Sequence, residues 1–146
     1  MLEEISKIGF QLLDKPYKEL DAVPFVAFVH EPKDYVNHLT GETIKAEDVD
    51  FLSRVWFLGV IHQTYPGSIS CCTGSAAVIP DTIVSDIRGA KETMDVRIGH
   101  PGGVIDVEAK CDVDETGTPV LKRISYGRTA RRLMDGYSYV PNSRFM

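Results

Sequence analysis

One charge-free segment, "YPGSISCCTGSAAVIP" (residues 65–80), limits the fold of this chain more than any other feature. A helix over residues 69–79 would carry no charge on any face. Such a helix, with no charged face to turn to water, is predicted to be buried on every side. The small residues Gly74, Ala76 and Ala77 would let surrounding strands approach closely, so we expect a sheet that wraps around a central helix.

The start of this helix has two possible positions. In one, the adjacent cysteines lie in a loop before a helix that begins at Thr73, and the following proline leaves barely two turns. In the other, Ser68 is the N-cap and the helix runs over residues 69–79, a length that suits a stable helix better. We favour the second position, in which Cys71 and Cys72 are packing residues.

The beginning of the helix is the first candidate binding site. Unpaired backbone N–H groups at Gly67, Ser68, Ile69 and Ser70 form a natural site for a carboxylate or phosphate. His62 precedes this segment and is a candidate hydrogen-bond donor to the same ligand. In the alternative interpretation, water or the Ser68 side chain satisfies the N–H groups and His62 is a partly exposed connector residue.

The remaining pattern predicts an α+β domain with few helices and many strands. Residues 105–113 alternate strictly between apolar and charged side chains, which is typical of a strand with one face in the core. Pro16 and Gly59 are expected to end two helices. We expect those helices over 2–13 and 47–58, and extended segments over 22–29, 81–87, 94–99, 105–113, 120–127 and 128–140.

The composition fits one globular domain over residues 1–146, with 43% hydrophobic and 25% charged residues. The net charge of −5 gives no basic surface for nucleic acid. No apolar run is long enough to span a membrane, and the first ten residues lack the apolar core of a signal peptide. Three cysteines, two of them adjacent, argue against a disulfide framework, so a cytoplasmic setting is expected. No histidine pair has metal-ligand spacing, so no metal is expected.

Four motifs carry a resemblance to a known family. The stretches "ETIKAEDVDFLSRVWFLGVIH", "AAVIPDT", "VRIGHPGGVIDVE" and "GRTARRLMDGYSYVP" together resemble the C-terminal half of PrpF-type proteins, over residues 42–141. This group contains methylaconitate and methylitaconate isomerases and is related in fold to diaminopimelate epimerase. The resemblance implies a curved mixed sheet or barrel around a central buried helix.

The resemblance also implies a reaction and a site. The family moves a proton on small unsaturated di- or tricarboxylic acids without a cofactor or metal, and the helix N-terminus at residues 67–70 would hold a substrate carboxylate. The family's "GHPSG" motif is matched here by Gly99, His100 and Pro101, whereas Gly102 replaces the serine. His100 and Gly102 are therefore candidate substrate contacts, with a shaping role for the turn as the alternative.

Two departures limit this expectation. The chain has about half the family's length, and the N-terminal half with the catalytic cysteine and lysine has no counterpart here. The related epimerases place a second cysteine before the helix, where the alignment puts Pro66. We therefore expect a carboxylate-binding domain that is inactive alone and needs a missing N-terminal domain.

Two other functions remain open. One is a structural or interaction module that forms a homodimer through the surface that would otherwise face the absent domain. The other is a thiol-based redox protein that uses Cys71 and Cys72.

Overall fold

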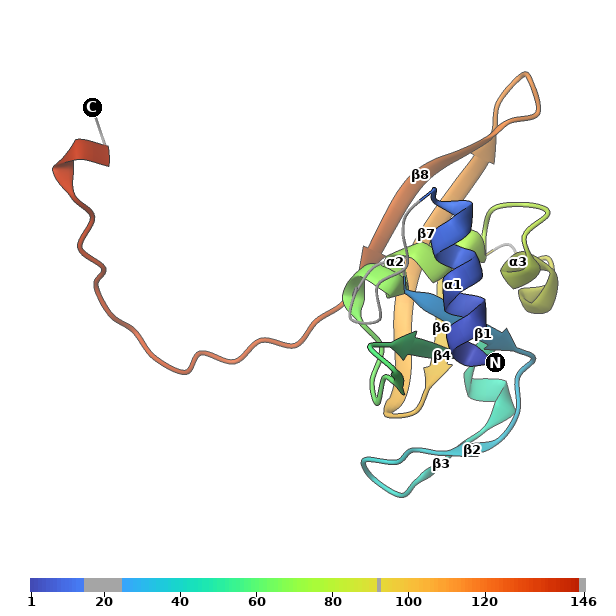
Figure 1. Cartoon of the computed structure of the whole chain (residues 1–146), viewed down its shortest axis with the longest axis horizontal. Helices are drawn as coiled ribbons and strands as arrows, with labels where there is room; N and C mark the ends of the chain where they lie inside the picture. The colour runs from blue at the N-terminus through green and yellow to red at the C-terminus, as the bar shows by residue number, and fades with distance from the viewer. Residues whose placement is uncertain (15–24, 92, 145–146) are drawn as a thin grey trace.

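A mixed sheet of six strands curls around one side of helix α2 (Gly67–Ala76) in the computed structural model of the chain (Figure 1). The structure describes residues 1–14, 25–91 and 93–144. The strand order is β1-β4-β6-β7-β8, with β5 paired to β4, and neighbouring strands are antiparallel except β4 and β6. The sheet strands are β1 (Val26–His30), β4 (Phe51–Phe57), β5 (Val60–Ile61), β6 (Asp95–His100), β7 (Gly103–Val113) and β8 (Pro119–Tyr126).

The other elements are short and lie around the sheet. A separate two-stranded hairpin connects β1 to β4. These elements are α1 (Leu2–Leu12), β2 (Tyr35–Val36), β3 (Thr43–Ile44), η1 (Ala46–Asp48), α3 (Ile83–Arg88) and η2 (Asn142–Arg144). The expected α+β class, with a curled mixed sheet around a helix, is confirmed. The sheet is an open half-barrel, because β1 and β8 stand at its two ends.

The clearest predicted strand is confirmed as β7. Its residues Val107 and Ala109 are each 1% exposed, whereas Glu108 between them faces outward and accepts a hydrogen bond from Arg123 on β8. This alternation follows from the two-residue period of a strand. The predicted strands over 94–99 and 120–127, and the helix at the N-terminus, are also present as β6, β8 and α1. Pro16, expected to end that helix, lies outside the described residues.

Two predicted elements are wrong. Residues 47–58 form η1 and then β4, not a helix: Phe51, Ser53 and Val55 are buried while the residues between them are more exposed. The apolar residues of this segment fit both the period of a helix and the two-residue period of a strand. The segment forms a strand because it pairs with β1 and β6. Residues 81–87 form α3, not a strand, because Thr82 and Ser85 make reciprocal capping hydrogen bonds at its start.

Helix α2 differs from the expectation in its limits and its burial. Its N-cap is Pro66 and not Ser68, since the extended backbone of Pro66 leads directly into the first turn. It ends at Ala76, before Pro80. One face is buried, through Ile69, Ser70, Thr73 and Gly74, whereas Ser68 and Cys72 are exposed. The prediction of burial on every side was wrong because small uncharged residues tolerate both environments, and the open sheet covers one side only.

The C-terminal segment 128–141 contains no strand and pairs with no strand of the described residues, so the extended segment expected over 128–140 is not part of the sheet. Figure 1 shows it running away from the sheet after β8. Its large apolar side chains are therefore uncovered: Tyr137 and Tyr139 are 99% and 98% exposed.

The contact between α2 and β7 leads to a first prediction. A Cβ added at Gly74 would lie 2.5 Å from Cγ1 of Val107, a buried residue with a stiff side chain. Gly74→Ala is expected to lower the free energy of unfolding by about 1–2 kcal/mol, because overpacking outweighs the better helix propensity of alanine. Urea unfolding measures this change.

The neighbouring substitution Ser75→Ala is the matched control and should not lower stability, since Ser75 lies outside the buried face of α2. Adding Val107→Ala should relieve the clash, so the double variant should lose less stability than the sum of the single variants. Strict additivity would contradict the contact.

Candidate functional site

The site begins with three backbone N–H groups at the start of α2. The amides of Gly67, Ser68 and Ile69 belong to the first turn and have no acceptor within the helix. Pro66 provides no side-chain cap. Because Ser68 is exposed, this end of the helix is open at its second residue. The arrangement suits an anionic ligand, since the helix dipole adds partial positive charge at the same end.

Ser70 differs from its three neighbours. Its amide and its hydroxyl both donate to the carbonyl oxygen of Pro66, at 2.9 Å each. Its side chain is fully buried. Ser70 therefore holds the first turn together from inside and has no free donor, while the three amides before it make no hydrogen bond to the described part of the chain.

A residue that the sequence did not indicate, Tyr126, lies at this end of α2. Gly67 leaves room for Tyr126, since a Cβ added at Gly67 would clash with the tyrosine hydroxyl oxygen. The Arg128 guanidinium lies 6.0 Å from the centre of the Tyr126 ring. The site therefore has a phenol at the start of α2 and a cation over the ring of that phenol. Tyr126 is far away in the sequence, so only the packing of β8 on α2 brings it here.

His100 lies beside the segment that leads into α2. It is 8% exposed, and its ring stacks on that of Tyr65, with 5.9 Å between the ring centres. Burial, with smaller contributions from the charges of Arg54, His38 and His62, lowers the pKa of His100 to about 4. The ring is therefore neutral at pH 7. Its Nδ1 accepts a hydrogen bond from the Gly102 amide at 3.2 Å, which leaves the proton on Nε2.

Tyr65 anchors this part of the site to the core. Its hydroxyl donates to Ser53 Oγ on β4 at 2.8 Å and lies 2.9 Å from Thr73 Oγ1 on α2. Burial raises the pKa of Tyr65, although these two hydrogen bonds act in the opposite direction. The network fixes α2 against the sheet and, through the ring stack, fixes His100 against the start of α2.

The remaining sequence candidates lie around the same segment. His62 Nδ1 accepts from the Thr64 amide at 3.2 Å, and the His62 ring lies 6.0 Å from that of Phe57. A Cβ at Gly102 would lie 3.2 Å from the Gln63 carbonyl oxygen and 3.0 Å from a terminal methyl of Leu39. The family's serine would thus crowd this turn, and glycine lets the β2–β3 hairpin pack closely on it.

The two adjacent cysteines lie within α2, not in a loop before it. Cys71 is half-buried and Cys72 exposed, so the expectation that both are packing residues is wrong for Cys72. All three cysteines are free thiols. Within the described ranges, no cluster of His, Cys, Asp and Glu is placed to hold a metal ion, and no helix has the length and apolar character of a membrane span.

Comparison with known proteins supports the resemblance. The family described as PrpF protein matches residues 4–141. A 3-methylitaconate isomerase from Eubacterium barkeri is 43% identical over 152 residues, which cover 99% of this chain and 39% of that protein. A 2-methyl-aconitate isomerase from Shewanella oneidensis is 40% identical over 118 residues, covering 81% of this chain and 29% of that protein.

A solved structure also supports the resemblance to this family. The crystal structure of a methylitaconate-delta-isomerase superposes with a TM-score of 0.59 at 43% identity and covers 73% of this chain and 29% of that one. The chain thus spans about two fifths or less of the length of these relatives. Because the family match covers nearly all of the sequence and the fold is shared, the chain belongs to the PrpF family.

Proposed function

We propose that the chain is one domain of an isomerase that moves a proton on small unsaturated di- or tricarboxylic acids of the methylaconitate or methylitaconate kind. The observation that carries this proposal is the 43% identity to a 3-methylitaconate isomerase over almost the whole chain. The free amides of Gly67, Ser68 and Ile69 support it, because they provide a place for a substrate carboxylate.

In this proposal, the chain contributes binding and charge stabilisation. When a base removes a proton from the carbon next to a carboxylate, negative charge spreads onto the carboxylate oxygens. The N–H groups at the start of α2 then interact more strongly with that carboxylate than in the ground state, which lowers the barrier. The neutral His100 ring carries its proton on Nε2, and the Arg128 guanidinium lies over the ring of Tyr126.

The base comes from outside this chain, in the part of the PrpF fold that the relatives contain and this chain does not match. The isolated chain is therefore expected to bind methylitaconate weakly and to show no turnover. NMR titration measures the binding, and following the isomer ratio of methylitaconate or methylaconitate with the pure chain measures turnover. Appreciable turnover would contradict the division of roles between the two parts of the fold.

A charge placed at the helix start tests the binding site. Ser68→Asp is expected to raise the free energy of unfolding by about 0.3–1 kcal/mol, since a carboxylate in the first turn interacts favourably with the helix dipole. The same carboxylate occupies the place of the ligand, so methylitaconate binding should be lost. Thermal unfolding and NMR titration measure the two effects.

Ser75→Asp, in the last turn of α2, is the matched control. The added charge now meets the negative end of the dipole, so stability should fall while methylitaconate binding persists. If Ser68→Asp left binding intact, the helix start would not be the carboxylate site.

The second candidate function is a non-catalytic module that forms a homodimer. The exposed apolar side chains of segment 128–141 favour it, because such a surface is usually covered by a partner. These are Leu133, Met134, Tyr137, Tyr139 and Val140. A dimer in sedimentation analysis that has no affinity for methylitaconate would support the module, and a monomer that binds methylitaconate would support the isomerase domain.

A further inference from the structure

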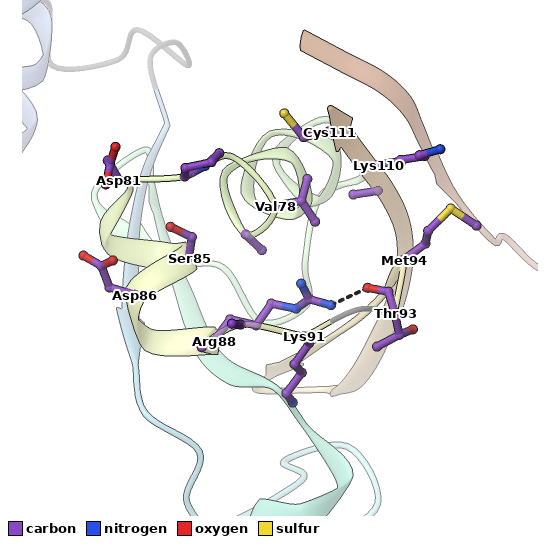
Figure 2. Close-up of a pocket in the computed structure, with 15 residues that line it drawn as sticks. Val78, Asp81, Ser85, Asp86, Arg88, Lys91, Thr93, Met94, Lys110 and Cys111 are labelled. Carbon is purple, nitrogen blue, oxygen red and sulfur yellow. Dashed lines mark hydrogen bonds between the residues drawn. The ribbon is translucent and has the colours of Figure 1, made fainter. Parts of the chain in front are cut away.

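A separate cavity of about 470 Å³ lies at the other end of α2, away from the candidate site (Figure 2). It is bounded by the residues that follow α2, by α3, by the loop before β6 and by part of β7. Val78, Met94 and Ala109 give it apolar walls, and Arg88, Lys91 and Lys110 contribute positive charges. None of these residues belongs to the site proposed for the isomerase.

The Arg88 guanidinium is the central polar group of this cavity in Figure 2. Its side chain is 3% exposed. Nη2 donates to the carbonyl oxygens of Thr93 and Asp95 at 2.8 and 3.0 Å. Nε is fully buried, and neither Nε nor Nη1 has an acceptor among the described residues. A buried guanidinium thus keeps donors unused, which is costly in a protein interior.

The charge of Arg88 is also poorly compensated. Its carboxylate neighbour, Asp50, lies 3.8 Å from Nε, too far for a hydrogen bond. Asp50 is engaged more closely by Lys91 at 2.6 Å and by Arg97 at 3.1 Å. Among the residues that the structure describes, three cations therefore surround a single carboxylate. An anion in the cavity would improve this balance.

The acidic residues that line the cavity do not fill this role. Asp81 and Asp86 stand on the α3 side, and Figure 2 shows their carboxylates turned away from the Arg88 guanidinium. The apolar walls on the opposite side favour contact with the carbon atoms of a ligand over contact with water. The cavity therefore combines a guanidinium that keeps unused donors with apolar walls on one side, which suits an organic anion better than a fully hydrated ion.

We propose that this cavity binds a small organic carboxylate, whose charged group pairs with Arg88 and whose apolar body packs against Val78, Met94 and Ala109. The site is independent of the isomerase site, since it uses the C-terminal end of α2 and no residue of its first turn.

Benzoate, its uncharged analogue benzamide and inorganic phosphate test this proposal by NMR titration of the whole chain. Benzoate should shift the methyl signals of Val78 and Ala109 in a saturable manner. Benzamide should bind about tenfold or more weakly, because it lacks the charge that pairs with Arg88. Phosphate should also bind more weakly, because it gains nothing from the apolar walls. Equal binding of benzamide or of phosphate would overturn the proposal.

A variant that blocks the cavity without touching Arg88 completes the test. Met94 is 44% exposed and lines the cavity, so Met94→Trp should fill it and abolish benzoate binding while the fold persists. Met134→Trp, at an 86% exposed residue of the C-terminal segment, is the matched control and should bind benzoate like the parent. Unchanged benzoate binding by Met94→Trp, or loss of binding in both variants, would overturn the assignment of the site.

Discussion

Replacing Asp50 by asparagine is expected to lower the free energy of unfolding by about 3–5 kcal/mol, the usual cost of removing one partner from a buried ion pair. The Asp50 side chain is 3% exposed and lies within 4 Å of charged nitrogens of Arg88, Lys91 and Arg97. It also accepts a hydrogen bond from the Arg97 amide. Asparagine keeps the shape but leaves the cations without a counter-charge. Urea unfolding of both proteins measures the loss.

Asp34→Asn is the matched control, because Asp34 pairs with Lys45 at 2.8 Å on the exposed surface. Solvent screens this pair, so stability should change little. An Asp50→Asn variant as stable as Asp34→Asn would show that the buried cluster does not contribute as proposed.

Asp50 is also expected to make the free energy of unfolding depend on pH in the acidic range. Burial alone would raise the pKa of Asp50, but the hydrogen bonds from Lys91 and Arg97 outweigh it and hold the pKa below 3.8. The stability that ionised Asp50 contributes is therefore complete above about pH 4 and is lost as the pH falls through its lower folded-state pKa. The Asp50→Asn variant should lack this part of the acid dependence.

His100 is expected to make the fold less stable as the pH falls from 6.5 towards 4. The pKa of His100 is about 4 in the folded chain, against an ordinary value of 6.5. Between these values the unfolded chain binds the proton and the folded chain does not, so acid favours unfolding. The difference corresponds to about 3 kcal/mol lost by pH 4. Unfolding curves at several pH values measure it.

His100→Gln removes the titrating group. The test compares how the free energy of unfolding changes with pH, so a loss of stability that is equal at every pH does not affect it. The variant should show a flatter profile between pH 6.5 and 4 than the parent. His30→Gln, at an exposed histidine, is the control and should follow the parent. Parallel profiles for His100→Gln and the parent would contradict a buried, neutral His100.

The sequence predicted a secondary-structure element correctly where its local pattern fitted one type of element only. Residues 105–113 alternate so strictly that only a half-buried strand fits, and β7 confirms it. Residues 49–56 satisfied two periods at once, and the sequence-based choice of a helix was wrong. At residues 81–87, the capping pair of Thr82 and Ser85 was a readable helix signal that the apolar pattern obscured.

Some residues of the candidate site could likewise be predicted from the sequence, and others could not. Gly67, Ser68 and Ile69 could be proposed from the sequence, because the uncharged run after a turn indicated a helix start and free amides follow from helix geometry, although the N-cap was expected at Ser68 and is Pro66. Tyr126 could not, since no local pattern distinguishes it from other residues at the end of a strand. Its place beside Gly67 depends on how β8 packs against α2.

The sequence by itself determined the class of the fold, the presence of an uncharged central helix and the family, because these follow from short-range periodicity and from long shared motifs. Only the tertiary structure decided which face of that helix is buried, which side chains gather at its two ends and that Arg88 lies buried beside a shared carboxylate. These features depend on contacts between residues distant in the chain. The free energy of such contacts comes from burial and charge pairing, which local sequence does not encode.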